Sequence, residues 1–478
     1  MSAEPRVVSE APQGTPDSAE PLDTRSSFRQ WYMVVVLALT YIVNYIDRGA
    51  LNLMVEPIKH DLNLTDVQMS FLLGFAFVSL YSLGIVPAGY IADRVSRRLL
   101  LSGAVVFWSG ASVLSGFAGN YWQLFVGRAG LGLGESALPP TAYSLLRDGI
   151  QEKNRGLAFS IYNSALMLGN GAGALFGGAV FTLATAGFFA SLPFFGDLKP
   201  WQYVIIVPGL CATVIVFLLL SIREPPRAKV AATGEPVSFA EMLRYVRANA
   251  RIYAVLFASA VTLSLGFAGW NAWIAAALGR RWGISPGTIG HTIGTFGLVL
   301  FPISVFLVGT LMDFIKRRWA DPAGPFWVAA GGCALNLVPA MLVLHAPSVK
   351  SMWIFYGFYI FCTTAGVQIA GGYVLATVTP GRLMGKLTSF YYLVNNLLAG
   401  ATAPTIMAMV AQYGFQGPRA LLNSMSICYA TFISITIVIL LIGARESRRW
   451  HRGRRAEAAV SAQTVPVVSG SPVESARG

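Results

Sequence analysis

Residues 89–98 read GYIADRVSRR, and residues 309–318, 220 positions later, read GTLMDFIKRR. The two segments share a glycine, an aspartate and a final pair of arginines: Gly89, Asp93, Arg97 and Arg98 in the first, and Gly309, Asp313, Arg317 and Arg318 in the second. Each segment follows an apolar block of about twenty residues, the length that crosses a bilayer core as a helix. The copy predicts that the chain consists of two related halves.

Two further repeats have nearly the same offset. Gly156, Ser160 and Tyr162 recur as Gly385, Ser389 and Tyr391, 229 positions later. The pair at 223–224, Arg-Glu, recurs at 445–446. Parallel repeats of this kind allow two helix bundles to rock around a site near the middle of the membrane.

The composition is that of a membrane protein. Only 12% of the 478 residues are charged, where soluble chains carry about 25%, and 55% are hydrophobic. The formal net charge of +13 does not indicate nucleic acid as a partner, because the basic residues lie in short loops between apolar blocks. Membrane lipids are the expected surroundings.

Twelve apolar blocks are long enough to span a bilayer, which predicts an all-α polytopic membrane protein. They run over residues 31–55, 69–92, 99–118, 121–146, 156–182, 201–222, 252–278, 289–312, 326–345, 351–377, 383–411 and 419–442. We therefore expect a first six-helix bundle at 29–222, a linker at 223–251 and a second bundle at 252–444. The stretch 1–28 is expected to be a disordered tail, and 445–478 is expected to be a tail that is basic at first and disordered after Arg455.

The distribution of Lys and Arg predicts the orientation. Loops on the side of the two termini hold seventeen of these residues, and loops on the other side hold six. Because basic loops remain in the cytosol, both termini are predicted to be cytosolic, in a multi-pass protein of the plasma (inner) membrane.

Four charged residues interrupt the apolar pattern at membrane depth: Asp47 and Arg48 in the first span, and Arg128 and Glu135 in the fourth. Each costs about 2.5 to 3.5 kcal/mol at a helix centre, so they must face one another, water or a ligand. Arg128 and Glu135 are seven residues apart and share one helix face, about 10 Å apart along the axis.

Three interpretations of this quartet remain open. It forms salt bridges that only hold the two spans together, or the arginines bind an anion, or Asp47 and Glu135 carry protons. Burial favours the neutral form of a carboxylic acid and a nearby arginine favours its charged form, so relative movement of the two would load or release a proton.

Aromatic and amide side chains inside the spans predict a cavity for an amphipathic ligand. In the first half they are Tyr41, Asn44, Tyr45, Asn52 and Asn163, and in the second half Trp270, Asn271, Trp273, Gln368, Tyr391 and Asn395. The alternatives are that the aromatic residues mark the membrane interface and that the amides join helices.

Glycines and prolines predict packing and bending rather than chemistry. Gly169, Gly173 and Gly177 repeat every four residues, which favours close helix approach. Pro139 and Pro140 are predicted to bend the fourth span just after Glu135.

No cofactor or metal is predicted. The four cysteines, at 211, 333, 362 and 428, lie inside apolar blocks without CxxC spacing, so neither disulfides nor a metal site are expected. The segment 381–387, GRLMGKL, has three residues between its glycines where a P-loop has four. No nucleophile and base pair is evident at membrane depth, so an enzyme is not expected.

The repeated loop and the EKNRG segment at 152–156 resemble the signature loops of the major facilitator superfamily, and the resemblance covers about residues 30–445. Within it, NYIDRGALN at 44–52, VGRAGLGLGESALPP at 126–140 and REPPR at 223–227 are most similar to the spinster-like transporters. The organic-anion symporters share the first two patterns.

The resemblance implies a proton-coupled secondary transporter that works by alternating access. It implies that Asp47 and Glu135 couple transport to protons. It also implies a cytosolic gate formed by Gly89, Asp93, Arg94, Arg97 and Arg98 and by the second copy at Gly309, Asp313, Arg317 and Arg318. The copy has Phe314 where the first has Arg94, so its gate should be weaker.

The substrate implied by the spinster-like proteins is a lysophospholipid, a sphingolipid-like molecule or another amphipathic organic ion, moved by a monomer. A symporter for a small organic acid is the alternative within transport. A gradient-independent facilitator, and a receptor or scaffold, are further alternatives.

Overall fold

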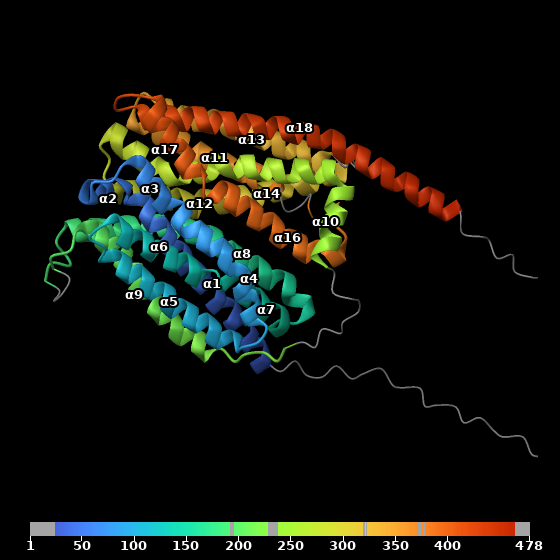
Figure 1. The fold of residues 1–478 in the computed structure, drawn as a ribbon, viewed down its shortest axis with the longest axis horizontal. Helices are drawn as coiled ribbons and strands as arrows, with labels where there is room; N and C mark the ends of the chain where they lie inside the picture. Colours follow the sequence, from blue (N-terminus) through green and yellow to red (C-terminus); the bar gives the residue numbers. More distant parts are fainter. Residues whose placement is uncertain are drawn as a thin grey trace, which may run out of the picture.

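The structure is a computed structural model that describes residues 24–191, 196–227, 238–318, 321, 323–370, 375 and 378–463. Within these ranges it contains helices and no strand. The helices form two bundles, coloured from blue to green and from green to red in Figure 1. Both the first residue of α1 and the last of α18 lie at the same end of the molecule (Figure 1).

The first half supplies nine helices from the described residues. They are α1 (Thr24–Leu53), α2 (Val55–Leu62), α3 (Asp66–Leu73), α4 (Phe75–Ala92), α5 (Arg97–Gly116), α6 (Tyr121–Glu135), α7 (Leu138–Gly149), α8 (Glu152–Thr185) and α9 (Pro200–Ser221). In this bundle α1 packs on α8, α5 on α9, and α4 on α6.

The second half begins with a short helix in the linker. Its elements are α10 (Phe239–Ala248), α11 (Ala250–Trp282), α12 (Pro286–Arg318), α13 (Gly324–His345), α14 (Val349–Ala370), α16 (Gly381–Asn395), η1 (Asn396–Gly400), α17 (Ala403–Gly414) and α18 (Ala420–Gln463). Here α13 packs on α14 and α18, and α11 packs on α18.

The all-α membrane architecture is confirmed. Among the described residues, ten stretches are long and apolar enough to cross a membrane, which is consistent with the twelve predicted spans. The two remaining predicted spans coincide with α6 plus α7 and with α14. The pair α6 and α7 does not form one apolar helix because it carries Arg128 and Glu135 and is divided after Glu135.

The helices extend into the predicted tails and linker. Helix α1 already begins at Thr24, inside the stretch expected to be disordered, and α18 continues to Gln463, past Arg455, after which disorder is expected. The linker contains α10, so only part of it is irregular among the described residues. Residues 1–23 and 464–478 lie outside the described part of the chain.

The predicted bend in the fourth span is confirmed as a break. Helix α6 ends at Glu135 and α7 begins at Leu138 with Pro139 in its first turn. Proline lacks a backbone N–H, so it is accommodated most readily in the first turn of a helix, where that N–H has no partner in the helix. The break places Glu135 at a helix end.

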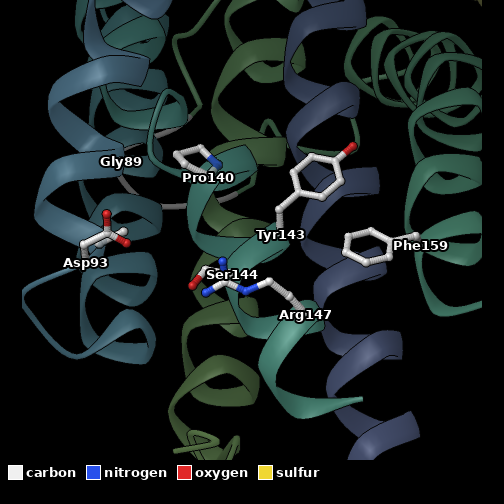
Figure 2. A pocket seen from close by; sticks show the side chains of 8 residues that line it. Gly89, Asp93, Pro140, Tyr143, Ser144, Arg147 and Phe159 are labelled. Carbon is white, nitrogen blue, oxygen red and sulfur yellow. The ribbon is translucent and has the colours of Figure 1, made fainter. Parts of the chain in front are cut away.

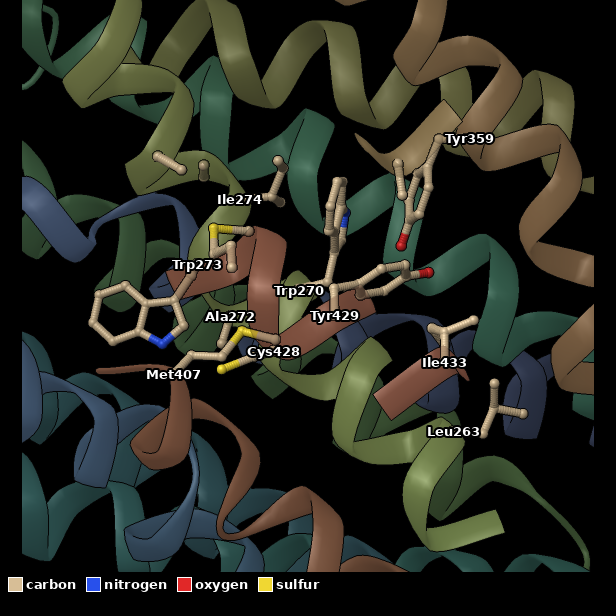
Figure 3. Packing of buried hydrophobic residues seen from close by; sticks show 14 of the residues in the cluster. Leu263, Trp270, Ala272, Trp273, Ile274, Tyr359, Met407, Cys428, Tyr429 and Ile433 are labelled. Atoms are coloured by element: carbon tan, nitrogen blue, oxygen red, sulfur yellow. The ribbon is translucent and has the colours of Figure 1, made fainter. Parts of the chain in front are cut away.

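An aromatic core fills the second bundle (Figure 3). Trp270 is fully buried, with its ring 4.5 Å from that of Tyr359 and 5.0 Å from that of Tyr429. Trp273 is also fully buried, and its indole N–H donates to the carbonyl of Pro404 at 2.9 Å. The expectation that these two tryptophans line a cavity is therefore wrong, because both are used to pack α11 against its own bundle.

Glycines bring α8 close to α1, as their spacing predicts. A Cβ atom at Gly169 would lie 2.6 Å from Cβ of Tyr45, and one at Gly173 would lie 2.9 Å from the carbonyl oxygen of Tyr45. Gly156, at the start of the same helix, has no such neighbour within 4 Å. The close approach holds the functional residues of α1 in place.

We expect Gly173→Ala to lower the melting temperature of the detergent-solubilised protein, because its methyl group would meet the backbone of α1. Gly156→Ala is the matched control in the same helix and should be neutral or stabilising, since replacing a helical glycine in open space gains up to about 1 kcal/mol. Equal behaviour of the two variants in a thermal unfolding assay would contradict the packing described here.

Candidate functional site

A buried ion pair joins α1 to α6. The Nε and Nη2 atoms of Arg48 each lie 2.6 Å from Oε2 of Glu135. The Glu135 side chain is fully buried and that of Arg48 is 21% exposed. The pair therefore has one partner sealed inside the first bundle and one partner that reaches accessible space.

Aromatic rings surround the Arg48 guanidinium. Its central carbon lies 4.9 Å from the ring centre of Tyr45, 4.5 Å from that of Phe77 and 4.6 Å from that of Tyr81. Cation–π contacts stabilise a desolvated cation without neutralising it. The guanidinium can accordingly remain charged when its carboxylate partner changes.

Asp47 has a different environment from Glu135. Its Oδ1 atom accepts a hydrogen bond from the hydroxyl of Ser112 on α5 at 2.8 Å, and it is 5% exposed. Among the described residues no Lys or Arg forms an ion pair with it. Adjacent residues on α1 thus point to different helices, Arg48 to α6 and Asp47 to α5.

Arg128 and Asn44 complete the group. Arg128 is 5% exposed, interacts electrostatically with both acids and lies 5.4 Å from the centre of the Phe77 ring. Asn44 is fully buried beside Glu135. The predicted quartet is therefore brought together as one ion pair with two further charges nearby, and not as two ion pairs.

The predicted cavity residues differ in exposure. Asn163 and Asn271 are exposed, and Tyr41, Tyr45, Asn52 and Asn395 are half-buried. Asn44 is fully buried and Tyr391 is 6% exposed, so neither presents an open surface. The side chain of Gln368 lies outside the described residues.

A series of aromatic contacts that sequence reasoning missed leads away from the ion pair. The rings of Tyr41 and Tyr45 are 5.4 Å apart, and Tyr41 stacks on Tyr162 at 4.8 Å. Tyr162 in turn contacts Tyr143 at 5.6 Å, and Tyr143 stacks on Phe159 at 5.4 Å. These residues come from three helices, so no periodicity in one helix could reveal them.

The series ends at a cavity of about 380 Å³ between α4, α7 and α8. Its lining is shown in Figure 2 and consists of Gly89, Ala92, Asp93, Pro140, Tyr143, Ser144, Arg147 and Phe159. We call the end of the molecule that contains this cavity and residues 93–98 the basic end. The predicted gate residues Gly89 and Asp93 therefore lie beside an open space.

The predicted gate arginines have separate roles at this end. Arg97 is 1% exposed, with Nη1 2.6 Å from Oδ2 of Asp148 and Nε 3.1 Å from Oε1 of Glu224. Arg98 donates to the carbonyls of Leu220 and Ile222, at 3.2 and 3.3 Å.

Arg94 and Asp93 are more open. The Arg94 guanidinium lies 3.5 Å from the centre of the Tyr90 ring. Asp93 is exposed, and its carboxylate forms no ion pair with a described residue. Gly309 is exposed, and the side chains of Asp313, Arg317 and Arg318 lie outside the described residues.

The linker also binds this end. Arg227 donates to the carbonyls of Ala92 at 3.0 Å and Val95 at 2.6 Å, and also contacts that of Asp93. These carbonyls lie at the last residue of α4 and just after it, where a helix end leaves acceptors without partners. The REPPR motif contains both Glu224 and Arg227 and was the only sequence feature that pointed to these contacts. Their partners, in residues 92–97, are more than a hundred positions away in the sequence, so the motif did not reveal them.

Two depressed carboxylate pKa values follow from the Arg97 network. Burial raises the pKa of Glu224, but hydrogen bonds from the Ser96 hydroxyl and from Arg97 outweigh it, so that this pKa lies below its ordinary value. Burial likewise raises the pKa of Asp148, and hydrogen bonds from Arg147 and Arg97 lower it further than burial raises it. Both groups remain charged at neutral pH.

At the opposite end, an arginine of the second bundle binds two acids of the first. Arg280 on α11 donates through Nε to Glu56 on α2 at 2.8 Å, and through Nη1 and Nη2 to Asp66 on α3 at 2.9 and 2.6 Å. We call these three residues the Arg280 cluster. Charge-assisted, bidentate contacts of this kind are among the stronger hydrogen bonds in proteins.

Close helix packing accompanies this cluster. Helix α8 packs on α12 and α3 packs on α17 across the bundles. A Cβ atom at Gly178 would lie 2.7 Å from the carbonyl of Gly287, and the hydroxyls of Ser70 and Thr405 are 3.1 Å apart. The two bundles are therefore joined tightly at the end opposite the basic end.

The family model of the Major Facilitator Superfamily matches residues 37–404. The chain belongs to the major facilitator superfamily. As a member, it is a multi-pass membrane transporter of a small-molecule substrate and not an enzyme.

The chain is similar to proteins named spinster. It is 25% identical to human protein spinster homolog 1 over 403 residues, which cover 80% of this chain and 73% of the relative. It is 26% identical to an MFS-type efflux pump of Mycolicibacterium smegmatis over 337 residues, which cover 70% and 73%.

A solved structure supports the same fold. A bacterial homologue of the human lysosomal transporter spinster, in an inward-facing and unoccupied conformation, has a TM-score of 0.73 and 22% identity. The match covers 89% of this chain and 97% of that one.

We expect Glu224→Gln to lower the melting temperature at pH 7, because each hydrogen bond to a charged group contributes about 1.5 to 3 kcal/mol. A depressed carboxylate pKa contributes stability that is fully present above the ordinary Glu value of about 4.3 and is lost as the pH falls through the folded value. The difference from the wild type should therefore persist down to about pH 4 and narrow below it. Glu152→Gln, at an exposed position without an ion pair to a described residue, is the control, and a difference independent of pH would contradict the assignment.

We expect Arg280→Gln to loosen the end opposite the basic end. The measurement is the labelling of a cysteine at Thr405 by an impermeant maleimide, in a chain with Cys211 replaced by serine. Labelling should accelerate several-fold in Arg280→Gln. Arg281→Gln is the matched control, because Arg281 donates to Ala346 within its own bundle at 2.5 Å. Equal labelling in the two variants would show that the Arg280 cluster does not hold the bundles together.

Proposed function

We propose that the protein is a proton-coupled secondary transporter that moves an amphipathic or anionic organic molecule by alternating access. Asp47 and Glu135 are the proposed proton carriers, and Arg48 and Arg128 the proposed anion-binding and tuning residues. The observation that carries the proposal is the Arg48–Glu135 ion pair, in which a fully buried acid holds a partly exposed arginine.

The geometry of this pair links anion binding to protonation. An anionic substrate group that binds Arg48 competes with Glu135 for the same guanidinium. Once released, Glu135 would be an unpaired charge in a fully buried position, which costs several kcal/mol. Uptake of a proton removes that charge, so occupancy of Arg48 by an anion and protonation of Glu135 favour each other.

Asp47 supplies a second titratable group in a separate position. It is buried and bonded only to the neutral Ser112 hydroxyl among the contacts described above. Its charge state therefore depends on the nearby charges of Glu135 and Arg128, with both of which it interacts electrostatically. A shift of α6 relative to α1 would change both acids together, which is what coupling to a conformational cycle needs.

The two ends supply the proposed gates. With both termini in the cytosol of a plasma (inner) membrane protein, the basic end with its cavity beside Asp93 is the cytosolic end, and the Arg280 cluster closes the outer end. The conformation is then open to the cytosol. In the opposite state, Gly89, Asp93 and the second copy at Gly309 and Asp313 would form the closed cytosolic gate.

The aromatic series favours an amphipathic substrate. Tyr143 is 41% exposed and lies near Tyr392 of the second bundle, which is 55% exposed. Aromatic groups on both sides of this space suit an apolar substrate part, while Arg48 suits an anionic head. The similarity to proteins named spinster supports a lysophospholipid or a sphingolipid-like molecule. Both bundles are in one chain, so a monomer is the proposed functional unit.

A small organic acid is the second candidate substrate. Arg48 and Arg128 both lie against the Phe77 ring, at 4.5 and 5.4 Å from its centre, so the two guanidinium groups converge on one region. Two convergent arginines fit a compact carboxylate. Flux into proteoliposomes with panels of lysolipids and organic acids, under an imposed pH gradient, discriminates between the candidates.

We expect Glu135→Gln to abolish accumulation driven by a pH gradient and to retain exchange of substrate across the membrane. The neutral amide cannot release a proton, so one step of the coupled cycle is lost while binding at Arg48 remains possible. Asp47→Asn should act in the same direction. The measurement is radiolabelled flux into proteoliposomes with and without the gradient.

Asp321→Asn provides the control, because Asp321 pairs with Arg448 at the surface of the basic end. It should transport like the wild type. Undiminished gradient-driven accumulation in Glu135→Gln would favour a gradient-independent facilitator. Absence of any flux in the wild-type protein would favour a receptor or scaffold.

A further inference from the structure

Helix α10 lies across the basic end of the second bundle. In Figure 1 it runs roughly perpendicular to the long helices beside it. Met242 of α10 is fully buried, and the hydroxyl of Tyr245 on the same helix donates to the carbonyl of Val378 at 3.1 Å. One face of α10 is thus fixed to the bundle, and α11 begins two residues after it ends, at Ala250.

The remaining surface of α10 is divided into an apolar edge and a basic edge. Phe239 and Leu243, four residues apart, are 58% and 40% exposed. Arg244 and Arg247 on α10, and Arg251 in the first turn of α11, are exposed as well. At 100° per residue, Arg244 and Arg247 lie about 60° apart around α10, directly beside the arc that contains Phe239 and Leu243.

The three arginines are available for a partner. None of them forms an ion pair with a described residue, whereas Arg382 on α16 pairs with Glu241 at 3.0 Å. An exposed apolar edge next to unpaired arginines is typical of a helix that lies in the membrane interface. Anionic lipid headgroups attract basic residues at this level.

We propose that α10 is an interfacial helix that binds anionic phospholipid headgroups through Arg244 and Arg247, together with Arg251 at the start of α11, and inserts Phe239 and Leu243 into the same leaflet. The position fits, because α10 adjoins the end of the membrane-spanning helix α11. The charge fits, because the arginines offer three cations and the phosphate of an anionic lipid offers acceptors that match a guanidinium.

The surface is connected to the second bundle through α16. Glu241 of α10 holds Arg382 near the start of α16, and the Phe239 ring lies 6.0 Å from that of Phe390 on the same helix. Lipid bound at α10 would therefore affect the position of α16 at the basic end. The inference does not depend on the transported substrate or on proton coupling.

Lipid retention by the full-length protein tests the proposal. The protein is reconstituted in vesicles of palmitoyl-oleoyl phosphatidylethanolamine and phosphatidylglycerol, solubilised mildly, and measured by native mass spectrometry for bound phosphatidylglycerol. The variant is Arg244→Gln with Arg247→Gln. The matched control is Arg449→Gln with Arg452→Gln, which makes the same charge change on α18, where no large apolar side chain is exposed among the described residues beyond Ile442.

The α10 variant should lose most of the retained phosphatidylglycerol, and the α18 variant should keep it. Equal retention in both variants, or equal loss, would overturn the proposal. Unchanged melting temperatures show that a loss does not arise from unfolding.

Insertion depth gives an independent readout. A bimane label on a cysteine at Leu243, in a chain with Cys211 replaced by serine, should be quenched by phospholipids brominated on their acyl chains. The same label on a cysteine at Arg452 should be quenched much less. If the label at Leu243 is not quenched, α10 does not lie in the membrane interface and the proposal fails.

Discussion

The contact on which the site depends is the ion pair between Arg48 and Glu135 inside an apolar bundle. A charge at this depth is expensive unless it is paired, and replacement of a buried pair by apolar residues is often neutral or stabilising. The presence of a buried pair in this bundle is therefore consistent with the proposed role in transport, for which stability alone gives little reason. The three aromatic rings around Arg48 allow the cation to persist while its partner changes.

The backbone is arranged to place this pair. Gly169 and Gly173 bring α8 against α1, which fixes the helix that carries Asp47 and Arg48. The break after Glu135 ends α6 at the second partner. Adjacent residues on α1 then point to α6 and α5, so that one acid pairs directly with an arginine and the other bonds to a serine hydroxyl. The two carboxyl groups therefore have different chemical environments. In two equivalent salt bridges their environments would be the same.

The two bundles have diverged in the use of the same helical plan. The first concentrates charge around its centre and around Arg97, while the second places Trp270, Tyr359 and Tyr429 in an aromatic core. What joins them is concentrated at one end, where the Arg280 cluster and the glycine contacts between α8 and α12 lie. The linker bridges the other end, since Arg227 binds the end of α4 and α10 binds α16. Separation of the bundles at the Arg280 cluster must therefore break polar contacts there, whereas each linker contact at the basic end involves only one bundle.

The sequence by itself determined the two-bundle helical plan, the four charged residues at membrane depth and the break in the fourth span. These follow from the length of apolar blocks, the cost of buried charge and the missing N–H of proline, all of which are local properties. It also identified the glycine spacing that packs α8 on α1. It placed Trp270 and Trp273 in a cavity because composition alone does not show which side of a helix faces its own bundle.

The tertiary structure decided which charge meets which. Arg48 pairs with Glu135 and Asp47 bonds to Ser112 because of the rotation of α1 between α5 and α6, which no single-helix pattern contains. Arg97 meets Glu224, and Arg280 meets Asp66, across more than a hundred residues of sequence. Such contacts depend on how helices pack against one another. Hydrophobic periodicity does not predict which helices pack together, because lipid-facing and core-facing positions are equally apolar.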